Sequence, residues 1–434
     1  MKSRNYLVVA ATFWAACGSS ENVEIDAASL GDRPPVAEAP IAPEANQAMD
    51  LVELTTDSSL AVDLEMDSWP AVDLEMGSFP GVDSPPAMDT SPPYDASWDA
   101  TIGNDGATEV ACNPEVLGTT PPALLSQTGC FEPGKPGQPI AAFFQYEVNS
   151  PLWSDGAVKS RFLMVPAGMT INVKDCDQDP TLCLPIGQGG APEDEGHFDL
   201  PIDSILIKNF RLQDKLIETR LLIRMSASLW TRYSYEWNEE ATEANLLSDS
   251  KDRTVGTQVW HYPSQQECIQ CHTAAAGRSL GLTTRQLDRV TSDGNQLDRM
   301  VAMGLLPTRP KALAPYPDPR KPGPVEDRAR AYLQTNCSFC HRPAGPFSDM
   351  DMRYVTALID MNLCGVPTVR GAIDPNVPLT RLVPGEPTAS AVSVRMHNRS
   401  GYAMPKIGSN LVDPDGVAVV DQWISEITSC PTSR

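Results

Sequence analysis

The chain changes its pattern of hydrophobic and polar positions twice along its 434 residues. Between residues 111 and 262, short apolar or alternating runs are separated by Pro, Gly and Asp. These runs are IAAFFQYEVNSPLW, KSRFLMVPAGMTINV, SILIKNFRL and ETRLLIRM. Such runs, bounded by turn-forming residues, are typical of β-strands. The sequence therefore predicts a β-rich domain over residues 111–262, built as a sandwich or as an open sheet.

From residue 263 onward, apolar residues recur instead at helical spacing. Helices are predicted over residues 283–290, 295–306, 325–337 and 416–427. The stretch TRPKALAPYPDPRKPGP at 308–324 can be neither a regular helix nor a central strand, because proline lacks the backbone N–H that both require. We therefore expect a linker at 308–324, between a first segment at 263–307 and a C-terminal domain at 325–434.

Residues 18–110 show neither periodicity and are rich in Pro, Asp, Ala and Ser. They carry a degenerate ten-residue repeat, in which AVDLEMDSWP at 61–70 is followed by AVDLEMGSFP at 71–80. Repeats this short, broken by prolines and strongly charged, cannot bury enough apolar surface to fold. The sequence therefore predicts a disordered tether, and the expected fold class is multidomain α+β, with the tether, the β-rich domain and then a mainly α-helical region.

The acidic charge of the chain is concentrated in the tether. No Lys or Arg occurs between Arg33 and Lys135, whereas 18 Asp and Glu occur there. The formal net charge of the whole chain is −23 at pH 7. Such a charge repels phosphate, so we do not expect nucleic acid as a partner.

The N-terminus has the layout of a secretory signal over residues 1–17. Lys2 and Arg4 precede a short apolar run from Tyr6 to Ala16, which is too short to span a bilayer permanently. The ending Ala-Ala-Cys-Gly around Cys17 resembles a bacterial lipobox, although a tryptophan stands where leucine is common. An ordinary signal peptide that is cleaved nearby is the alternative interpretation.

We therefore expect an exported protein, periplasmic or surface-facing, that is anchored to the membrane by a lipid on Cys17. Gly18 stands where an aspartate would favour retention in the inner membrane, so the outer membrane is preferred.

Two motifs in the helical region carry the most specific chemistry. They are CIQCH at 268–272 and CSFCH at 337–341. In a CxxCH motif, the two thiols bond to the two vinyl groups of a haem, and the following histidine becomes an axial ligand of the iron. The sequence thus predicts two covalently bound haem c groups, one on Cys268, Cys271 and His272 and the other on Cys337, Cys340 and His341.

Two alternative interpretations of these motifs exist. A CxxC pair can be a redox dithiol, but that chemistry is usually found in a thioredoxin-like βαβ unit, which this sequence does not resemble. Cysteine and histidine can also bind structural zinc, but zinc fits poorly with an exported chain that forms disulfides.

The other six cysteines after Cys17 are expected to form disulfides, because the protein is exported to an oxidising compartment. Proximity in the sequence favours three pairs, although six cysteines allow 15 pairings. The preferred pairs are Cys112 with Cys130, Cys176 with Cys183, and Cys364 with Cys430.

The C-terminal domain contains SGYAMPKIGSNLVDPDGVAVVDQWI at 400–424, downstream of the second CxxCH motif. This arrangement resembles the C-terminal half of a class I cytochrome c. The resemblance implies that Met404 is the distal ligand of the second iron and that the last helix packs across the first. Met396 and His397 are the fallback ligands.

The sixth ligand of the first iron is less clearly indicated. Met303, on the helix expected at 295–306, and His261, seven residues before the motif, are equal candidates. A first iron with an open position is the third alternative. His197, in an acidic loop, is expected on the surface.

A longer resemblance covers about three quarters of the chain. It is carried by NSPLWSDGAVKSRF at 149–162, IETRLLIR at 217–224, YPSQQECIQCHTAAAGRSLGL at 262–282 and RARAYLQTNCSFCHRP at 328–343, with shorter phrases between them. In these phrases and their order the chain resembles a family of bacterial dihaem c-type cytochromes of uncharacterised role. The resemblance implies a β-rich N-terminal region, two haem sites and, as a partner, a parallel β-helix repeat protein.

These features together predict a lipid-anchored dihaem cytochrome that transfers single electrons between unknown redox partner proteins. Two alternatives remain open at this stage. One is a dihaem peroxidase or oxidase-like enzyme with an open first iron, and the other is a binding module in which the β-rich domain recognises a partner.

Overall fold

The structure, a computed structural model, describes residues 111–174, 196–368 and 376–432, which belong to one compact unit. Three predictions lie outside the described residues. They are the signal peptide at 1–17 with its lipidation site Cys17, the tether at 18–110, and the disulfide between Cys176 and Cys183.

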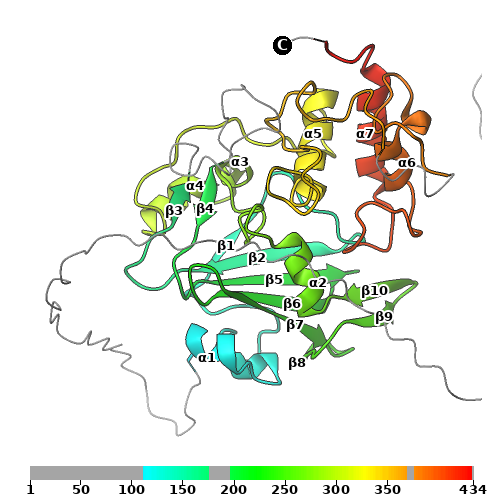
Figure 1. The fold of residues 1–434 in the computed structure, drawn as a ribbon. Coiled ribbons are helices and arrows are strands. Elements are labelled where there is room, and N and C mark those ends of the chain that lie inside the picture. Colours follow the sequence, from blue (N-terminus) through cyan, green and yellow to red (C-terminus); the bar gives the residue numbers. More distant parts are fainter. Residues whose placement is uncertain (1–110, 175–195, 369–375, 433–434) are drawn as a thin grey trace, which may run out of the picture. The chain divides into compact units, whose positions relative to one another are not determined.

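The largest sheet among the described residues is antiparallel, with the strand order β1-β2-β5-β6-β7-β8 (Figure 1). Its strands are β1 (Phe144–Tyr146), β2 (Val158–Met164), β5 (Ile205–Leu212), β6 (Lys215–Arg224), β7 (Trp230–Trp237) and β8 (Ala244–Leu246). Gln213 and Asp214 connect β5 to β6 with positive φ angles of 50° and 63°, as a type I′ hairpin turn requires. The predicted β-rich region is therefore confirmed, in the form of an open sheet.

Three two-stranded sheets accompany the central sheet in the described part of the chain. They pair β3 (Asn172–Lys174) with β4 (His197–Asp199), β9 (Lys251–Val255) with β10 (Gln258–Tyr262), and β11 (Val290–Thr291) with β12 (Gly294–Asn295).

The helices are mostly short. They are α1 (Pro114–Thr119), η1 (Leu125–Thr128), α2 (Gln265–Cys271), α3 (Thr284–Leu287), α4 (Gln296–Ala302), α5 (Val325–Asn336), η3 (Pro387–Ala389), α6 (Ala391–Met396) and α7 (Pro414–Glu426). The helices predicted at 325–337 and 416–427 correspond to α5 and α7.

The region after residue 263 is less helical than predicted. The helix expected at 283–290 is the single turn α3, and β11 begins at Val290. The helix expected at 295–306 ends at Ala302, because Gly304 follows with a φ of 73° and closes it. Residues 338–368 contain no helix or strand apart from isolated bridges.

Alternation along the strands gives the central sheet two differently covered faces. Ile205, Ile207 and Leu221 pack in one core with Leu117 of α1 and Leu125 of η1. Their neighbours Leu206 and Leu222 belong to a second core, together with residues of the segment after α2. The residues that this segment contributes are Leu282, Leu287, Leu297, Met300 and Leu306. The N-terminal helices therefore cover one face, and the segment with the first CxxCH motif lies on the other.

Helices α5 and α7 form the centre of a third core in the C-terminal region. Tyr332 and Leu333 of α5 pack there with Val420, Trp423 and further apolar residues of α7. The packing of the last helix against the helix before the second motif matches what the resemblance to class I cytochromes c implies.

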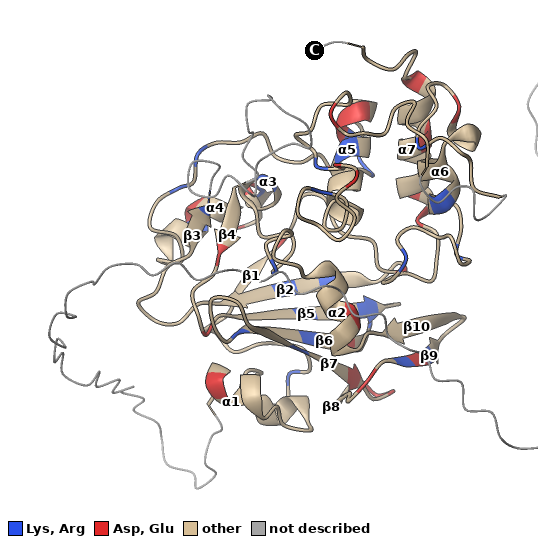
Figure 2. Ribbon diagram, viewed as in Figure 1, with Lys and Arg blue, Asp and Glu red and all other residues tan. Residues whose placement is uncertain are grey.

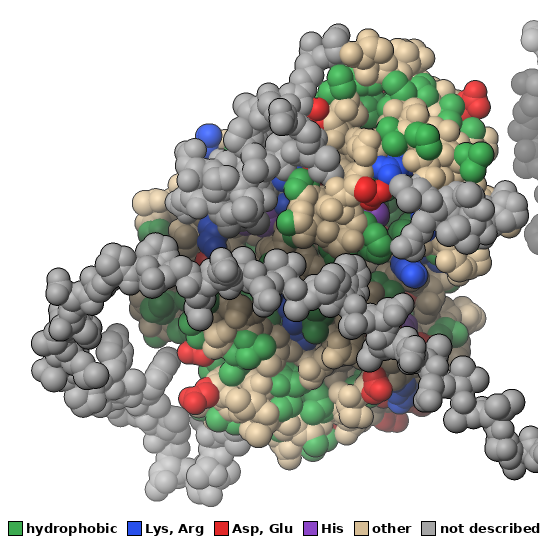
Figure 3. Space-filling view, viewed as in Figure 1, with side chains coloured by type: hydrophobic (Ala, Val, Ile, Leu, Met, Phe, Trp, Pro, Cys, Tyr) green, Lys and Arg blue, Asp and Glu red, His purple; other side chains and the backbone are tan. Residues whose placement is uncertain are grey.

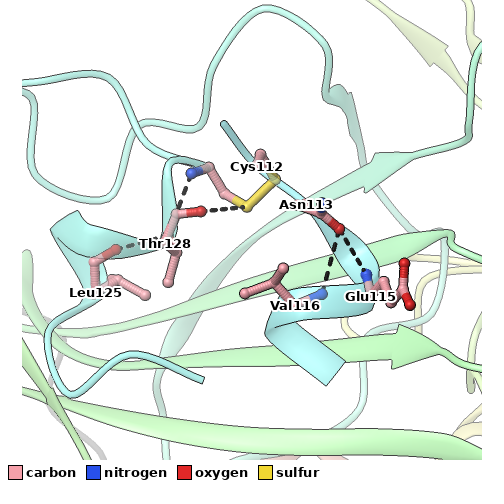
Figure 4. Close-up of a disulfide and its surroundings, with 7 residues drawn as sticks. Cys112, Asn113, Glu115, Val116, Leu125 and Thr128 are labelled. Carbon is pink, nitrogen blue, oxygen red and sulfur yellow. Dashed lines mark hydrogen bonds between the residues drawn. A yellow bond between two sulfur atoms is a disulfide. The ribbon is translucent and has the colours of Figure 1, made fainter. Parts of the chain in front are cut away.

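Two of the predicted disulfides are present, Cys112–Cys130 and Cys364–Cys430. The first one ties the start of α1 to the end of η1 (Figure 4). Beside it, the Asn113 side chain accepts hydrogen bonds from the backbone N–H groups of Glu115 (3.0 Å) and Val116 (3.3 Å), which caps α1. A bridge over 18 residues is expected to stabilise the fold by about 3 kcal/mol through loop closure.

The contact between α5 and α7 leads to a first prediction. A Cβ atom added at Gly416 of α7 would overlap the Tyr332 ring of α5. We expect Gly416→Ala to lower the free energy of unfolding by about 1–3 kcal/mol, because the overpacking outweighs the gain in helix propensity. Urea denaturation checks this, with Gly401→Ala as the control, because a Cβ at Gly401 meets nothing within 4 Å. Equal stability of the two variants would contradict the prediction.

Candidate functional site

The two CxxCH motifs have the same local geometry. The backbone N–H of His272 donates to the carbonyl oxygen of Cys268, and that of His341 donates to the carbonyl oxygen of Cys337, each at 3.0 Å. The first motif thus forms the last turn of α2, and the second forms a turn directly after α5. A turn of this kind brings the two cysteines of a CxxC spacing to the same side of the backbone, as attachment to one haem requires.

The two motifs lie next to each other although about 70 residues separate them in the sequence. The Cys340 Sγ atom is 3.7 Å from the backbone oxygen of Gln270, inside the first motif. The proline-rich segment at 308–324, predicted as a linker between two haem sites, does not hold the motifs apart. This contact is the central feature of the site.

All four motif cysteines are free thiols and partly buried. Burial raises the pKa of Cys271 and Cys337 to about 12 and that of Cys340 to about 11, and it also raises the pKa of Cys268. Redox-active dithiols instead depend on a thiol whose pKa is lowered. The environment of these cysteines therefore disfavours dithiol redox chemistry.

His272 is prepared to act as a metal ligand. Its Nδ1 donates a hydrogen bond to the backbone carbonyl of Arg278 at 2.5 Å. A carbonyl can only accept, so this bond places the proton on Nδ1 and leaves the lone pair on Nε2, the arrangement found in metal-binding histidines. Burial also lowers the pKa of His272 to about 3, which keeps the ring neutral. The first motif thus contains a histidine that is suited to bind haem iron as an axial ligand.

The second motif and Met404 lie in the C-terminal region. Burial lowers the pKa of His341, so this ring is also kept neutral. Met404 is half-buried, and its loop is held by two hydrogen bonds: its N–H donates to Arg395 (2.9 Å), and its carbonyl accepts from Arg399 (2.8 Å). Of the fallback ligands, Met396 is buried in the apolar core, and His397 is bonded through Nε2 to Asp421 (2.7 Å).

A cavity lies between the sheet and the two motifs. Cys268, Cys271 and His272 line it on one side, and Ser338 and Phe339 of the second motif line it on another. The space open to the centres of water molecules is about 180 Å³, roughly ten times what one water requires. The cavity therefore has room for a bound molecule rather than for isolated waters.

A seven-residue segment between β1 and β2, residues 149–155, connects the parts around this cavity. Ser150 Oγ donates to the carbonyl of Ala331 in α5 (3.1 Å). The Trp153 N–H donates to the Asn336 side chain (2.8 Å), directly before the second motif.

The end of the same segment holds the loop that follows Met404. The Asp155 carboxylate accepts the backbone N–H groups of Asn410 and Leu411 at 2.8–2.9 Å. Asn149 and Ser150 also bond to the segment around α3, residues 285–288. The segment therefore contacts α5, the residue before the second motif, the segment around α3 and the loop that follows Met404.

The cavity wall on the sheet side is strongly basic. The register of the sheet places Arg161 of β2 opposite Lys208 of β5, and Lys208 opposite Arg220 of β6. Lys159 and Arg232 flank this row, and all five side chains line the cavity. Figure 2 shows the basic residues on these central strands. On the face drawn in Figure 3, by contrast, basic side chains are scattered among acidic and apolar ones.

This basic row was not predicted from the sequence, although the sequence carries a pattern that indicates it. Each of the strand sequences LIKNF, ETRLL and WTRYS has a basic residue at its centre, and VKSRF has two at alternate positions. Only the register of the strands places these residues on one face.

The two predicted sixth ligands of the first iron differ in their position relative to the cavity. Met303 is 56% exposed at the end of α4 and is not among the residues that line the cavity. His261 does line the cavity, but both of its ring nitrogens contact carboxylates: Nδ1 that of Asp252 (2.7 Å) and Nε2 that of Glu267 (3.0 Å). Neither residue therefore offers the first motif an unbound sulfur or nitrogen atom that could bind the iron.

His197 was expected on the surface but lies in β4 and lines the cavity.

The described residues contain no cluster of three or more His, Cys, Asp or Glu side chains that could hold a metal ion. No helix in the described parts of the chain is long and apolar enough to cross a membrane.

The environment of His261 predicts a pH-dependent contribution to stability. Burial acts to lower its pKa, but the bonds to Asp252 and Glu267 outweigh this and raise it. A raised pKa stabilises the fold below the unfolded value of about 6.5, and this stabilisation is lost as the pH rises through the folded pKa.

We therefore expect the difference in unfolding free energy between the wild type and His261→Gln to be largest near pH 6 and to shrink towards pH 8. Urea denaturation at several pH values measures this difference. A difference that stays constant over the same range would contradict the prediction.

The comparisons with known proteins provide no relative from which a role can be transferred. The chain matches no protein-family model, no curated protein and no solved structure.

Proposed function

We propose that the protein is a dihaem c-type cytochrome that transfers single electrons. The observation that carries this proposal is the contact between the two CxxCH motifs, which meet beside one cavity. Electron transfer slows steeply with distance, so neighbouring attachment sites suit a relay better than separate ones.

Each group in the motifs has a definite role in this proposal. When bound, haem c supplies an iron that cycles between two oxidation states by gaining and losing one electron. Cys268 and Cys271 would hold the first haem, and Cys337 and Cys340 the second. His272 and His341 would be axial ligands, and Met404 would complete the ligation of the second iron and raise its reduction potential.

The cellular setting is also part of the proposal. The signal-like N-terminus supports export, and a lipid on Cys17 would hold the protein at the cell envelope, with the outer membrane preferred. The electron donor and acceptor would be other envelope proteins. A parallel β-helix repeat protein is the partner implied by the family resemblance.

The proposal predicts two covalent haems per polypeptide. A pyridine haemochrome assay measures this number on protein made in a host that matures c-type cytochromes. Cys268→Ala/Cys271→Ala and Cys337→Ala/Cys340→Ala should each reduce the number to one. A wild-type protein without covalent haem would refute the proposal, and a protein with one haem would leave one motif with a different role.

A second candidate function, a dihaem peroxidase, is favoured by the placement of Met303 and His261. Neither residue offers an unbound ligand atom to the first motif, and this candidate function requires that the first iron keep an open position facing the cavity. Such an enzyme would reduce hydrogen peroxide to two waters with two electrons and two protons.

Carbon monoxide distinguishes the two functions, because it binds ferrous haem that has an open position. We expect one equivalent to bind to the reduced wild type if the first iron is open, and none if both irons have six protein ligands. Met404→Ala serves as the positive control, since it should add one equivalent at the second iron. Optical titration of the reduced protein measures both values.

A further inference from the structure

The basic row on the sheet has too few carboxylate partners among the described residues. Arg220 is paired with Glu218, through Nε to Oε1 at 2.6 Å and Nη2 to Oε2 at 2.9 Å. Glu218 is fully buried and also accepts the Trp260 indole N–H at 3.0 Å. No other basic residue of the row forms an ion pair with a described residue.

The remaining cations make only neutral contacts within the described chain. The Lys159 ammonium donates to the Leu152 carbonyl and to Ser154 Oγ (2.9 Å). Arg161 donates to the Lys159 carbonyl at 3.3 Å. Lys208 lies between Arg161 and Arg220 and has no hydrogen bond or ion pair with a described residue.

The acidic residues that line the cavity are already bound elsewhere. Asp155 accepts the backbone N–H groups of Asn410 and Leu411. Glu267 bonds to His261 and to the N-cap of α2. Neither forms a hydrogen bond or an ion pair with the basic row, although Asp155 acts on Lys159 through space.

Like charges directly opposite each other on neighbouring strands destabilise a sheet. The cost is visible at Lys208, where burial and then the neighbouring arginines lower the pKa to about 7. Burial also lowers the pKa of Lys159 and of Arg161. A row of cations under these conditions indicates a site that an anion completes.

The position of the row relative to the first motif identifies the anion. Helix α2, which carries Cys268 and Cys271, contacts β7, whereas Lys208 and Arg161 lie on β5 and β2. Neighbouring strands are about 4.8 Å apart, so across the sheet Lys208 on β5 lies about 10 Å from β7, and Arg161 on β2 lies about 14 Å from it. That distance is comparable with the width of a porphyrin, whose two propionates lie on the edge opposite the two thioether bonds.

We propose that Lys208, Arg161 and Lys159 form the binding site for the two propionate carboxylates of the first haem. This inference rests on the proposed function, since it assigns residues to one of its two haems. Carboxylates matched by lysine and arginine at hydrogen-bonding distance are among the strongest polar pairs in proteins. Arg232 would support the thioether side, where its Nη2 donates to the His272 carbonyl at 3.3 Å.

The test is to replace Lys208 in the full-length holoprotein and to measure the midpoint potential of each haem by spectroelectrochemical titration. A nearby cation stabilises the reduced, more negative haem. Lys208→Met should therefore lower one midpoint, and Lys208→Met/Arg161→Met should lower it further, with two haems still bound. The resonance Raman bands of the propionates should change in the same variants.

The matched controls separate this effect from a general disturbance of the fold. Lys215→Met removes an exposed charge at the start of β6 and should leave both potentials unchanged. Lys208→Arg should have a midpoint potential close to that of the wild type, because arginine retains the positive charge.

Three outcomes would overturn the inference while leaving the dihaem proposal intact. The first is that Lys208→Met has no effect on either potential. The second is that its effect persists in the Cys268→Ala/Cys271→Ala background, which would place the cations at the second haem. The third is a wild-type potential that depends on added acetate or phosphate, which would indicate a site for free anions. Failure of the dihaem proposal itself would appear separately, as wild-type protein without haem.

Discussion

The hydrogen bonds of residues 149–155 are the interactions on which the arrangement of the site depends. This segment bonds to α5 through Ser150, to the residue before the second motif through Trp153, and to the loop after Met404 through Asp155. Most of these bonds involve backbone groups, which must be satisfied once they are buried. Loss of one of these bonds would therefore leave a buried polar group unpaired.

The interior around the cavity combines three features that suit the haem groups of the proposed function. Four thiols remain unpaired, two histidines are kept neutral by burial, and a row of cations lies on the central strands. Proteins usually avoid such a combination, because buried charge and unsatisfied polar atoms reduce stability. Covalently attached haem would account for all three features, since it uses the thiols, the imidazole nitrogens and carboxylate-binding cations together.

The sequence predicted elements whose pattern is local. The sheet region, α5, α7 and two of the preferred disulfides were confirmed. The prediction failed where tertiary contacts override periodicity. The segment at 283–290 has helical spacing, yet Thr283 and Gln286 bond to other parts of the chain, and only one turn of helix forms. His197 was misplaced because its position depends on the pairing of β4 with β3.

The sequence by itself determined the chemistry of the motifs, because the CxxCH spacing places two thiols and an imidazole on one turn wherever that turn lies. Only the tertiary structure decided that the two turns meet, with Cys340 against the backbone of Gln270. It also decided that basic residues of three strands, separated by up to 59 positions between Arg161 and Arg220, form one row. Both results follow from strand register and helix packing, which are long-range properties that no local pattern encodes.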